Sequence, residues 1–203
     1  RFIQHYSIKS EIVLSHIRKA NRGRVCLEKT HPFARELWGQ TWSFAHNGQL
    51  RGIKKRPLDR YQPVGATDSE HAFCWLLDQV RTAFPTRPRQ PRALWQLLAE
   101  LCADLASLGV FNLLLSDSSA FYAHCSTRLC WLTRRAPFGR ATLIDADMEI
   151  DFAQHAGPGD VVSVVATAPL TRDEIWRPFQ PGEFRVFRAG QPVATMQHAR
   201  AAP

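Results

Sequence analysis

Two adjacent helices in the middle of the chain constrain its fold most strongly. Residues 65–84 include the T-x-x-E capping sequence that starts at Thr67, and apolar side chains then recur at helical spacing. A second apolar stripe of helical period covers residues 91–109, where Pro91 suits the first turn and Gly109 a C-terminal cap. A proline-rich stretch separates the two. We therefore expect two distinct helices that follow each other directly.

Segments with the apolar pattern of strands lie on both sides of these helices. The run at 159–170 is almost entirely apolar, so we expect it to be covered on both faces. The last segment predicts a hairpin whose turn is Ala189-Gly190. Strands, then two helices, then more strands predict an α+β fold in which the helices pack together on a sheet. The predicted strand segments are 11–17, 41–50 (with a turn), 110–116, 121–125, 129–134, 148–152, 159–170 and 183–195.

The composition is typical of an ordinary globular domain. With 203 residues, 45% of them hydrophobic, the chain is long enough for one domain with a substantial core. No apolar run approaches the length of a membrane span, and the sequence does not open with a signal peptide. The net charge of +8 comes from scattered basic residues rather than from one basic face. A nucleic-acid partner is therefore not favoured.

Cysteine usage indicates a reduced, cytoplasmic protein. The five cysteines are odd in number, and no two of them form a C-x-x-C pair, which argues against both a disulfide framework and a zinc site. Nothing in residues 71–203 looks like a phosphosugar or ATP site. We expect neither a metal nor a cofactor. The cysteines are Cys26, Cys74, Cys102, Cys125 and Cys130.

Asn47-Gly48, in the stretch FAHNGQL, admits two interpretations. An Asn-Gly pair between apolar runs is the strongest short-range signal of a two-residue type I′ hairpin turn. Alternatively, the side-chain NH₂ of Asn47 and the backbone N–H of Gly48 could together bind a developing oxyanion. On these residues alone, the turn is the simpler interpretation.

Three further polar positions stand out, each with an ordinary structural alternative. Arg18 ends an apolar run and could hold a carboxylate in a bidentate fork, or be a plain loop arginine. Asp68 lies in the first turn of a predicted helix, where the helix dipole favours a carboxylate and capping alone would explain it. His31 could bind a metal, but it lacks a suitably spaced partner, and a structural imidazole explains it better.

Five stretches of the sequence are informative because of the order in which they occur. They are SHIRKANRG (15–23), THPF (30–33), FAHNGQL (44–50), GATDSE (65–70) and VVATAPLTRDEIWRPFQPGEFRVFRAG (164–190). Together they resemble the glutaminase domain of the class II glutamine amidotransferases, which are N-terminal-nucleophile hydrolases. The resemblance covers most of the chain and is closest to small standalone bacterial members and to the yeast glutathione-degradation subunit. It implies an αββα sandwich, in which two stacked, mainly antiparallel sheets are flanked by helices.

The resemblance also implies roles for individual residues. Arg18 matches the arginine that pairs with the α-carboxylate of glutamine, and Asp68 matches the aspartate that receives the α-amino group. Asn47, through its side-chain amide, and Gly48, through its backbone N–H, match the two donors of the oxyanion hole. Asn21 stands where relatives commonly have a substrate-binding threonine, and it could still donate a hydrogen bond.

The nucleophile is where the sequence departs from the family pattern. The family uses a cysteine at the mature N-terminus, whose own α-amino group serves as general base, whereas this sequence begins at Arg1. The family's opening strands are also missing, so we expect residues 1–203 to be a single glutaminase-type domain that is N-terminally incomplete. The chain as given is expected to be inactive, because all five of its cysteines are internal.

Two functions remain open at this point. The first is an enzyme that hydrolyses the γ-amide of glutamine, or of another γ-glutamyl compound, through a cysteine thioester, with a separate ammonia-accepting or complex-forming protein as a further partner. The second is a non-catalytic subunit that binds a γ-glutamyl ligand and has a regulatory role. A basic binder of nucleic acid or acidic protein rests on charge alone and is disfavoured. The sequence leaves a homo-oligomer open.

Overall fold

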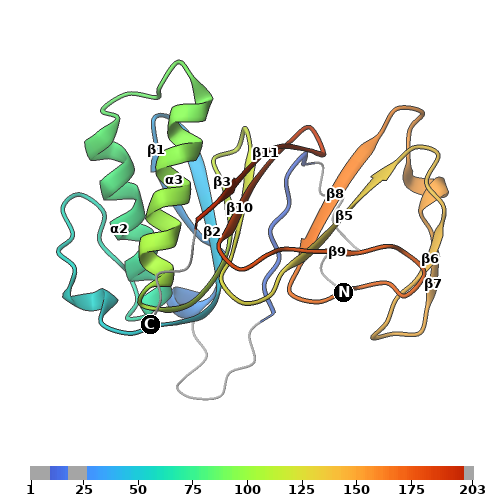
Figure 1. Ribbon diagram of the computed structural model, residues 1–203, viewed down its shortest axis with the longest axis horizontal. Helices are drawn as coiled ribbons and strands as arrows, with labels where there is room; N and C mark the ends of the chain where they lie inside the picture. Colours follow the sequence, from blue (N-terminus) through green and yellow to red (C-terminus); the bar gives the residue numbers. More distant parts are fainter. Residues whose placement is uncertain (1–9, 18–26, 199–203) are drawn as a thin grey trace.

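The computed structural model describes residues 10–17 and 27–198 and arranges them in layers (Figure 1). Two helices lie on one side, a six-stranded sheet lies next to them, and a smaller three-stranded sheet lies on the other side. Within these residues, no helix has the length and apolar character needed to cross a membrane. The helical segments are η1 (Leu27–Lys29), η2 (Ile53–Lys55), α2 (Asp68–Ala83), α3 (Pro91–Ala106) and η3 (Phe152–His155).

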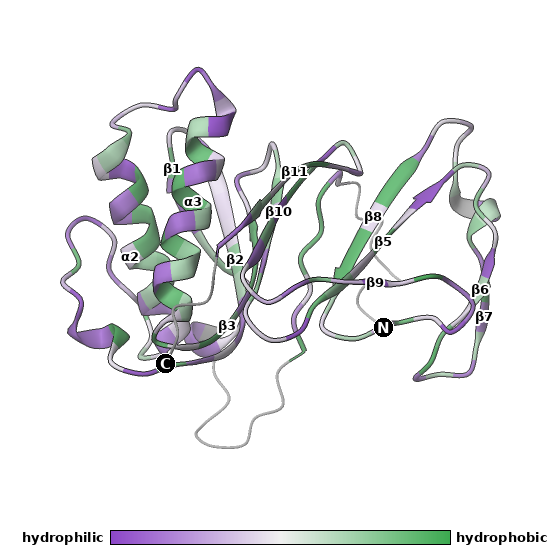
Figure 2. Cartoon of the chain, viewed as in Figure 1, coloured by the Kyte–Doolittle hydropathy of each residue, from purple (hydrophilic) through white to green (hydrophobic). Residues whose placement is uncertain are grey.

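The six-stranded sheet and the two helices enclose the main core. The strand order is β1-β2-β3-β4-β10-β11, and each neighbouring pair is antiparallel. Helix α2 packs on β1 and β2 while α3 packs on β3 and β10, so both helices cover one face of the sheet. Figure 2 shows apolar residues running along both helices and the strands beside them. The strands are β1 (Phe33–Leu37), β2 (Gln40–Leu50), β3 (Gly109–Ser116), β4 (Phe121–Cys125), β10 (Glu183–Arg188) and β11 (Gln191–Gln197).

A second, smaller core lies between the two sheets. It contains Trp131, Phe179 and Phe187 together with Ala123 and Cys125, all of them buried. The three-stranded sheet has the order β8-β5-β9, and its paired strands are antiparallel. The α+β class and the two stacked antiparallel sheets are therefore confirmed. The remaining strands are β5 (Cys130–Arg135), β6 (Arg140–Thr142), β7 (Glu149–Asp151), β8 (Val161–Ala166) and β9 (Arg177–Pro178).

The expectation that the apolar run at 159–170 would be covered on both faces is wrong. The strand in this run, β8, is mostly half-buried, and Val162 is 41% exposed. The reason is its position, because among the described residues β8 lies at the edge of the small sheet and, of its side chains, only that of Val165 packs against the inter-sheet core. An apolar sequence alone does not reveal which strand of a sheet lies at its edge.

The start of α2 follows the predicted capping sequence only in part. The Thr67 hydroxyl oxygen accepts a hydrogen bond from the Glu70 N–H at 3.1 Å, as a capping box requires. The Glu70 carboxylate, however, accepts from the N–H groups of Val64 (2.9 Å) and Gly65 (2.7 Å). It also pairs with Arg35 of β1 at 2.6 Å. Glu70 thus fixes the loop before the helix and ties α2 to the sheet.

The predicted strand at 11–17 is wrong. Residues 10–17 contain no strand, and Val13 (66%) and Ile17 (95%) are largely exposed. In Figure 1 this segment runs between the two sheets. Apolar, β-branched residues favour a strand only when a neighbouring strand completes the ladder, and the described part of the chain supplies none here.

The predicted end of the second helix is also wrong, whereas the final hairpin is confirmed. Helix α3 ends with a cap at Ser107, and Gly109 is instead the first residue of β3. Gly109 has φ +152°, and a Cβ there would lie 2.2 Å from the Gln49 carbonyl oxygen, so the glycine serves strand packing. In the final hairpin, Ala189 (φ 46°) and Gly190 (φ 71°) form the turn between β10 and β11.

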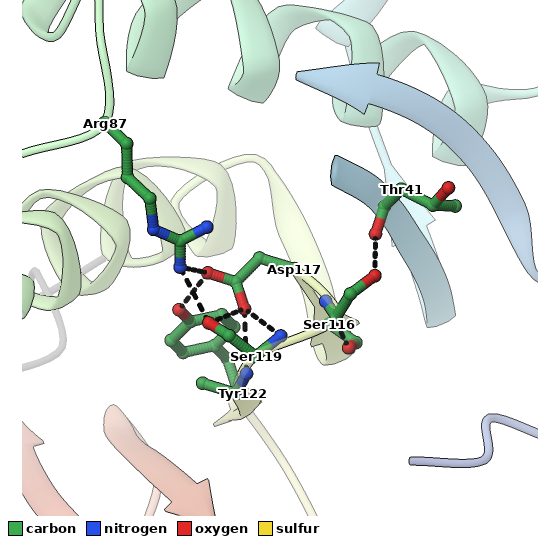
Figure 3. A network of polar contacts seen from close by, with 8 residues as sticks. Thr41, Arg87, Ser116, Asp117, Ser119 and Tyr122 are labelled. Atoms are coloured by element: carbon green, nitrogen blue, oxygen red, sulfur yellow. Dashed lines mark hydrogen bonds and ion pairs between the residues drawn. The ribbon is translucent and has the colours of Figure 1, made fainter. Parts of the chain in front are cut away.

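The buried carboxylate of Asp117 attaches the loop between α2 and α3 to the sheet (Figure 3). Asp117, which is fully buried after β3, accepts from the Arg87 guanidinium at 2.5 Å. It also accepts from the Tyr122 hydroxyl at 2.9 Å and from the N–H groups of Ser119 (3.0 Å) and Ala120 (2.8 Å). Because Arg87 belongs to the loop between α2 and α3, this network holds that loop against the β3–β4 turn.

Candidate active site

Asn47 and Gly48 lie inside a strand, so the predicted hairpin turn at these residues is wrong. Both belong to β2, where Asn47 pairs with Asn112 and Gly48 with Phe111 of β3. The turn of the first hairpin is instead Trp38-Gly39, where both φ angles are positive (57° and 74°). The strand that pairs with Asn47-Gly48 is β3, and both helices lie between β2 and β3 in the sequence. The local Asn-Gly turn signal therefore did not apply here.

Gly48 is required by a close backbone approach. A Cβ at this position would lie 1.9 Å from the carbonyl oxygen of Val110 and 2.9 Å from Nε2 of His46. The φ of Gly48 is +149°, a conformation that residues with a side chain rarely adopt. Asn47 and Gly48 are both exposed to solvent.

His46, immediately before this pair, is turned into the core. It is 2% exposed, and its ring centroid lies 5.0 Å from that of Phe111. Nε2 lies 3.0 Å from the Val110 carbonyl oxygen and Nδ1 lies 2.8 Å from the Ser69 hydroxyl. Because a carbonyl only accepts, the ring proton is on Nε2, and Nδ1 accepts from Ser69. Burial lowers the pKa of His46, although the Val110 hydrogen bond and the Asp68 charge oppose this shift.

Asp68 lies next to the C-terminal end of β2. It is the first residue of α2, it is half-buried, and its Oδ2 accepts from the Leu50 N–H at 2.8 Å. Ser69, the next residue, is the hydroxyl partner of His46. The first turn of α2 is thus fastened to β2 on both sides of Asn47-Gly48. Three of the five predicted site residues are assembled here, namely Asn47, Gly48 and Asp68.

The other predicted site residues, Arg18 and Asn21, lie outside the described residues. Cys26 also lies outside them. His31, the candidate metal ligand, is half-buried, and its ring packs against those of His16 (4.3 Å between centroids) and Phe33 (4.6 Å). Among the residues that the structure describes, no three or more His, Cys, Asp or Glu side chains are grouped so that they could hold a metal ion.

Asn112 is a buried residue of the site that the sequence analysis missed. It is 3% exposed, and its Oδ1 accepts from the N–H groups of Ser126 and Thr127, both at 3.1 Å. Its Nδ2 donates to the Thr127 hydroxyl at 2.8 Å and makes a longer contact of 3.4 Å with the Asn47 carbonyl oxygen. Asn112 therefore holds the loop after β4 beside Asn47. A single asparagine within the apolar run VFNLLL was the available signal.

The described cysteines are unsuited to nucleophilic attack. Cys74, Cys102, Cys125 and Cys130 are all buried and unbridged. Burial raises the pKa of Cys74 and of Cys125 to about 11, and it also raises the pKa of Cys102 and Cys130. A buried thiol with a raised pKa forms little thiolate at neutral pH, so none of these four side chains can serve as an activated nucleophile.

Comparisons with known proteins all indicate the same family. A model of the family described as "Glutamine amidotransferases class-II" matches residues 1–203. The protein named "Putative glutamine amidotransferase YafJ" from Escherichia coli (strain K12) is 53% identical over 193 residues, covering 95% of this chain and 76% of YafJ.

Solved structures give the same picture. The 2.0 Å crystal structure of a "predicted glutamine amidotransferase" from Pseudomonas aeruginosa PA01 is 49% identical, with a TM-score of 0.79. That match covers 88% of this chain and 70% of the other. The structure of an allosteric regulatory enzyme of purine biosynthesis is 14% identical with a TM-score of 0.52, covering 90% of this chain and 34% of that one. At that identity the likeness concerns the fold alone.

Proposed function

This chain belongs to the class-II glutamine amidotransferases, and we propose that it is the glutaminase-type domain of a hydrolase that cleaves the γ-amide of glutamine or of a related γ-glutamyl compound. The observation that carries the proposal is the placement of Asn47-Gly48 beside Asp68. These residues come from β2 and from the first turn of α2, and the contacts of Leu50 and His46 hold the two elements together. In this proposal, residues 1–203 form one such domain.

The Asn47-Gly48 pair supplies the electrostatic part of the reaction. Attack on the γ-carbonyl carbon moves a pair of electrons onto the carbonyl oxygen and creates an oxyanion. Two fixed donors, the side-chain NH₂ of Asn47 and the backbone N–H of Gly48, would stabilise that charge better than they stabilise the neutral carbonyl. Their position in a paired strand supports this role, because preorganised donors need little rearrangement during the reaction.

Asp68 and Arg18 bind the amino-acid head of the substrate in this proposal. Oδ2 of Asp68 accepts from the Leu50 N–H, and Oδ1 would accept from the ammonium group. Arg18 would pair with the α-carboxylate, and Asn21 would donate a further hydrogen bond. A cation and an anion at fixed positions select a zwitterionic head and align the γ-amide with the oxyanion donors.

The nucleophile of the proposed reaction is the thiolate of an N-terminal cysteine. Its sulfur forms a bond to the carbonyl carbon of the γ-amide, the leaving nitrogen takes a proton, and the C–N bond breaks to release ammonia. Water then cleaves the thioester and regenerates the thiol together with glutamate. A polypeptide made of these 203 residues alone carries arginine at its first position, and we expect it to leave glutamine intact.

The test is a turnover assay of the full-length protein with glutamine and with a chromogenic γ-glutamyl anilide. We expect release of glutamate from at least one of these compounds and no release by the 203-residue polypeptide. Binding of γ-glutamyl compounds without turnover by the full-length protein would contradict the enzyme and favour a non-catalytic binding subunit. Absence of both binding and turnover would reject both functions.

A further inference from the structure

We propose that His46 is a positioning residue that holds the Gly48 backbone and the Asp68 turn in fixed register. This inference rests on the proposed function, since it concerns how the same site is kept in shape. His46 does not itself face the site, because alternate residues of a strand point to opposite sides and Asn47 is the exposed neighbour. Any effect of His46 on the reaction must therefore pass through the groups it contacts.

The first contact reaches Gly48 through a single carbonyl group. Nε2 of His46 donates to the Val110 oxygen at 3.0 Å. This is the oxygen that a Cβ on Gly48 would approach to 1.9 Å, so the Gly48 backbone packs directly against it. A shift in the Val110 peptide would therefore change the position of Gly48 and the direction of its N–H.

The second contact reaches Asp68 through the neighbouring residue. Nδ1 of His46 accepts from the Ser69 hydroxyl at 2.8 Å, and Ser69 directly follows Asp68 in the first turn of α2. The carboxylate of Asp68 is held independently by the Leu50 N–H at 2.8 Å. Helix α2 is thus attached to β2 at two points, one before and one after the Asn47-Gly48 pair. His46 provides the first of them.

One imidazole can make both hydrogen bonds because one of its ring nitrogens donates and the other accepts. The Val110 carbonyl requires a donor, which places the ring proton on Nε2 and leaves Nδ1 as the acceptor for Ser69. Phe111 packs against the ring (centroids 5.0 Å apart), and the side chain is 2% exposed. The ring is therefore fixed in orientation, as a support for a catalytic group should be.

His124 provides a matched control within the same sheet. It lies in the same row of strand pairs, since Leu113 pairs with both His46 and His124, and it is 1% exposed. Its ring also lies near Phe111, at 5.9 Å between centroids. Neither ring nitrogen of His124, however, has a hydrogen-bond partner among the described residues. Replacing His124 removes a buried imidazole without touching Gly48 or Asp68.

The experiment separates the two contacts by using side chains that reproduce one nitrogen at a time. In His46→Gln the amide nitrogen can still donate to Val110, whereas in His46→Asn the shorter amide can only reach Ser69. We expect His46→Leu to lower kcat about 10- to 100-fold, because small displacements of an oxyanion donor are costly. His46→Gln should recover most of the lost kcat. His46→Asn should not.

Ser69→Ala tests the other contact. It leaves the Val110 hydrogen bond intact and loosens the turn that carries Asp68, so we expect a raised KM with kcat changed less than about twofold. His124→Leu should leave both kcat and KM within about twofold of the parent. Thermal unfolding of each variant shows whether it is folded. If His46→Leu does not fold, the comparison of His46→Gln with His46→Asn decides in its place.

A readout that does not need activity keeps this inference distinct from the proposed function. The backbone amide resonance of Gly48 should differ between His46→Gln and His46→Asn, which both lack the imidazole ring but of which only the first keeps the donor to Val110, and it should stay in place in His124→Leu. If the parent protein hydrolyses no γ-glutamyl compound, the proposed function fails while these resonances still report on the coupling. Identical Gly48 resonances in His46→Gln and His46→Asn, or a loss of kcat in His124→Leu equal to that in His46→Leu, would overturn the role of His46.

Discussion

At the residue scale, Asn47 offers a test of chemistry without a change in packing. Its side chain is exposed on β2, so removing the amide costs little folding free energy. We expect Asn47→Ala to lower kcat of the full-length protein about 100- to 1,000-fold, the usual loss for one oxyanion donor, with little change in KM or in melting temperature. Steady-state kinetics and thermal unfolding check both parts. Unchanged kcat would remove Asn47 from the oxyanion hole.

Gly48 should respond differently, because both packing and reactivity depend on it. A methyl group there would meet the Val110 carbonyl at 1.9 Å, and φ is +149°. We expect Gly48→Ala to abolish turnover and to lower the melting temperature by several degrees, which corresponds to about 1–3 kcal/mol of strain. Gly139→Ala is the control, since a Cβ at Gly139 meets nothing within 4 Å and its φ is ordinary. Equal melting temperatures for the two variants would contradict the close approach.

The sequence analysis predicted that Asn47, Gly48 and Asp68 are site residues, but its turn interpretation placed the first two in the wrong local structure. The Asn-Gly turn signal is local, whereas Gly48 is explained by Val110, which lies across the sheet and beyond both helices. His46, Ser69 and Asn112 escaped notice for a related reason. Their partners are distant in sequence, so the neighbouring residues do not show what they contact, although the place of Asn112 within an apolar run was a signal that it is unusual.

At the scale of elements, the attachment of the α2–α3 loop depends on Asp117. Its carboxylate is fully buried and accepts hydrogen bonds from Arg87, Tyr122 and two backbone N–H groups (Figure 3). We expect Asp117→Asn to lower the free energy of unfolding by about 3 kcal/mol, because a buried charged acceptor is lost while its donors remain. Urea unfolding measures this.

An exposed ion pair provides the comparison for Asp117. Arg56 and Asp104 also form a pair between a loop and a helix, but the Asp104 side chain is 47% exposed. We expect Asp104→Asn to cost less than about 1 kcal/mol, since water already screens this pair. If both variants lost the same free energy of unfolding, burial would not be what makes the Asp117 network important.

The two helices were predictable because their signals lie within the helices themselves. Thr67 caps α2 and Pro91 opens α3, as expected from residues adjacent in the sequence. The strand predicted at 11–17 failed because a strand also needs a neighbour, which local apolar residues do not supply. The exposure of β8 was missed for the same reason, since its place at the edge of a sheet is set by the whole topology.

At the scale of the whole molecule, buried histidines make the stability of this fold sensitive to acid. Burial is the main cause that lowers the pKa of His124, to about 4, with a smaller contribution from His198. Burial likewise lowers the pKa of His46. The same imidazoles in the unfolded chain titrate near 6.5. At pH values between the folded-state pKa and about 6.5, these imidazoles bind protons in the unfolded chain but stay neutral in the folded protein.

The sign of the resulting pH dependence follows from that difference. A folded-state pKa below the unfolded value means that the free energy of unfolding is highest above about pH 6.5 and falls as the pH falls toward the folded pKa. For His124 alone, the shift from about 6.5 to about 4 corresponds to a loss on the order of 3 kcal/mol across this range. The effect belongs to the whole molecule because unfolding is what exposes the ring.

His124→Leu isolates this contribution. Leucine has no titrating group, so the variant should lose less stability than the parent between pH 7 and pH 4.5, and the difference between their free energies of unfolding should shift in favour of the variant as the pH falls. Urea unfolding at a series of pH values measures the difference, in which the effects of the shared carboxylates cancel. Because neither ring nitrogen of His124 has a hydrogen-bond partner in the described structure, no hydrogen bond of the ring is lost in this comparison. Parallel pH profiles for the two proteins would mean that His124 is protonated as readily in the folded state as in the unfolded chain.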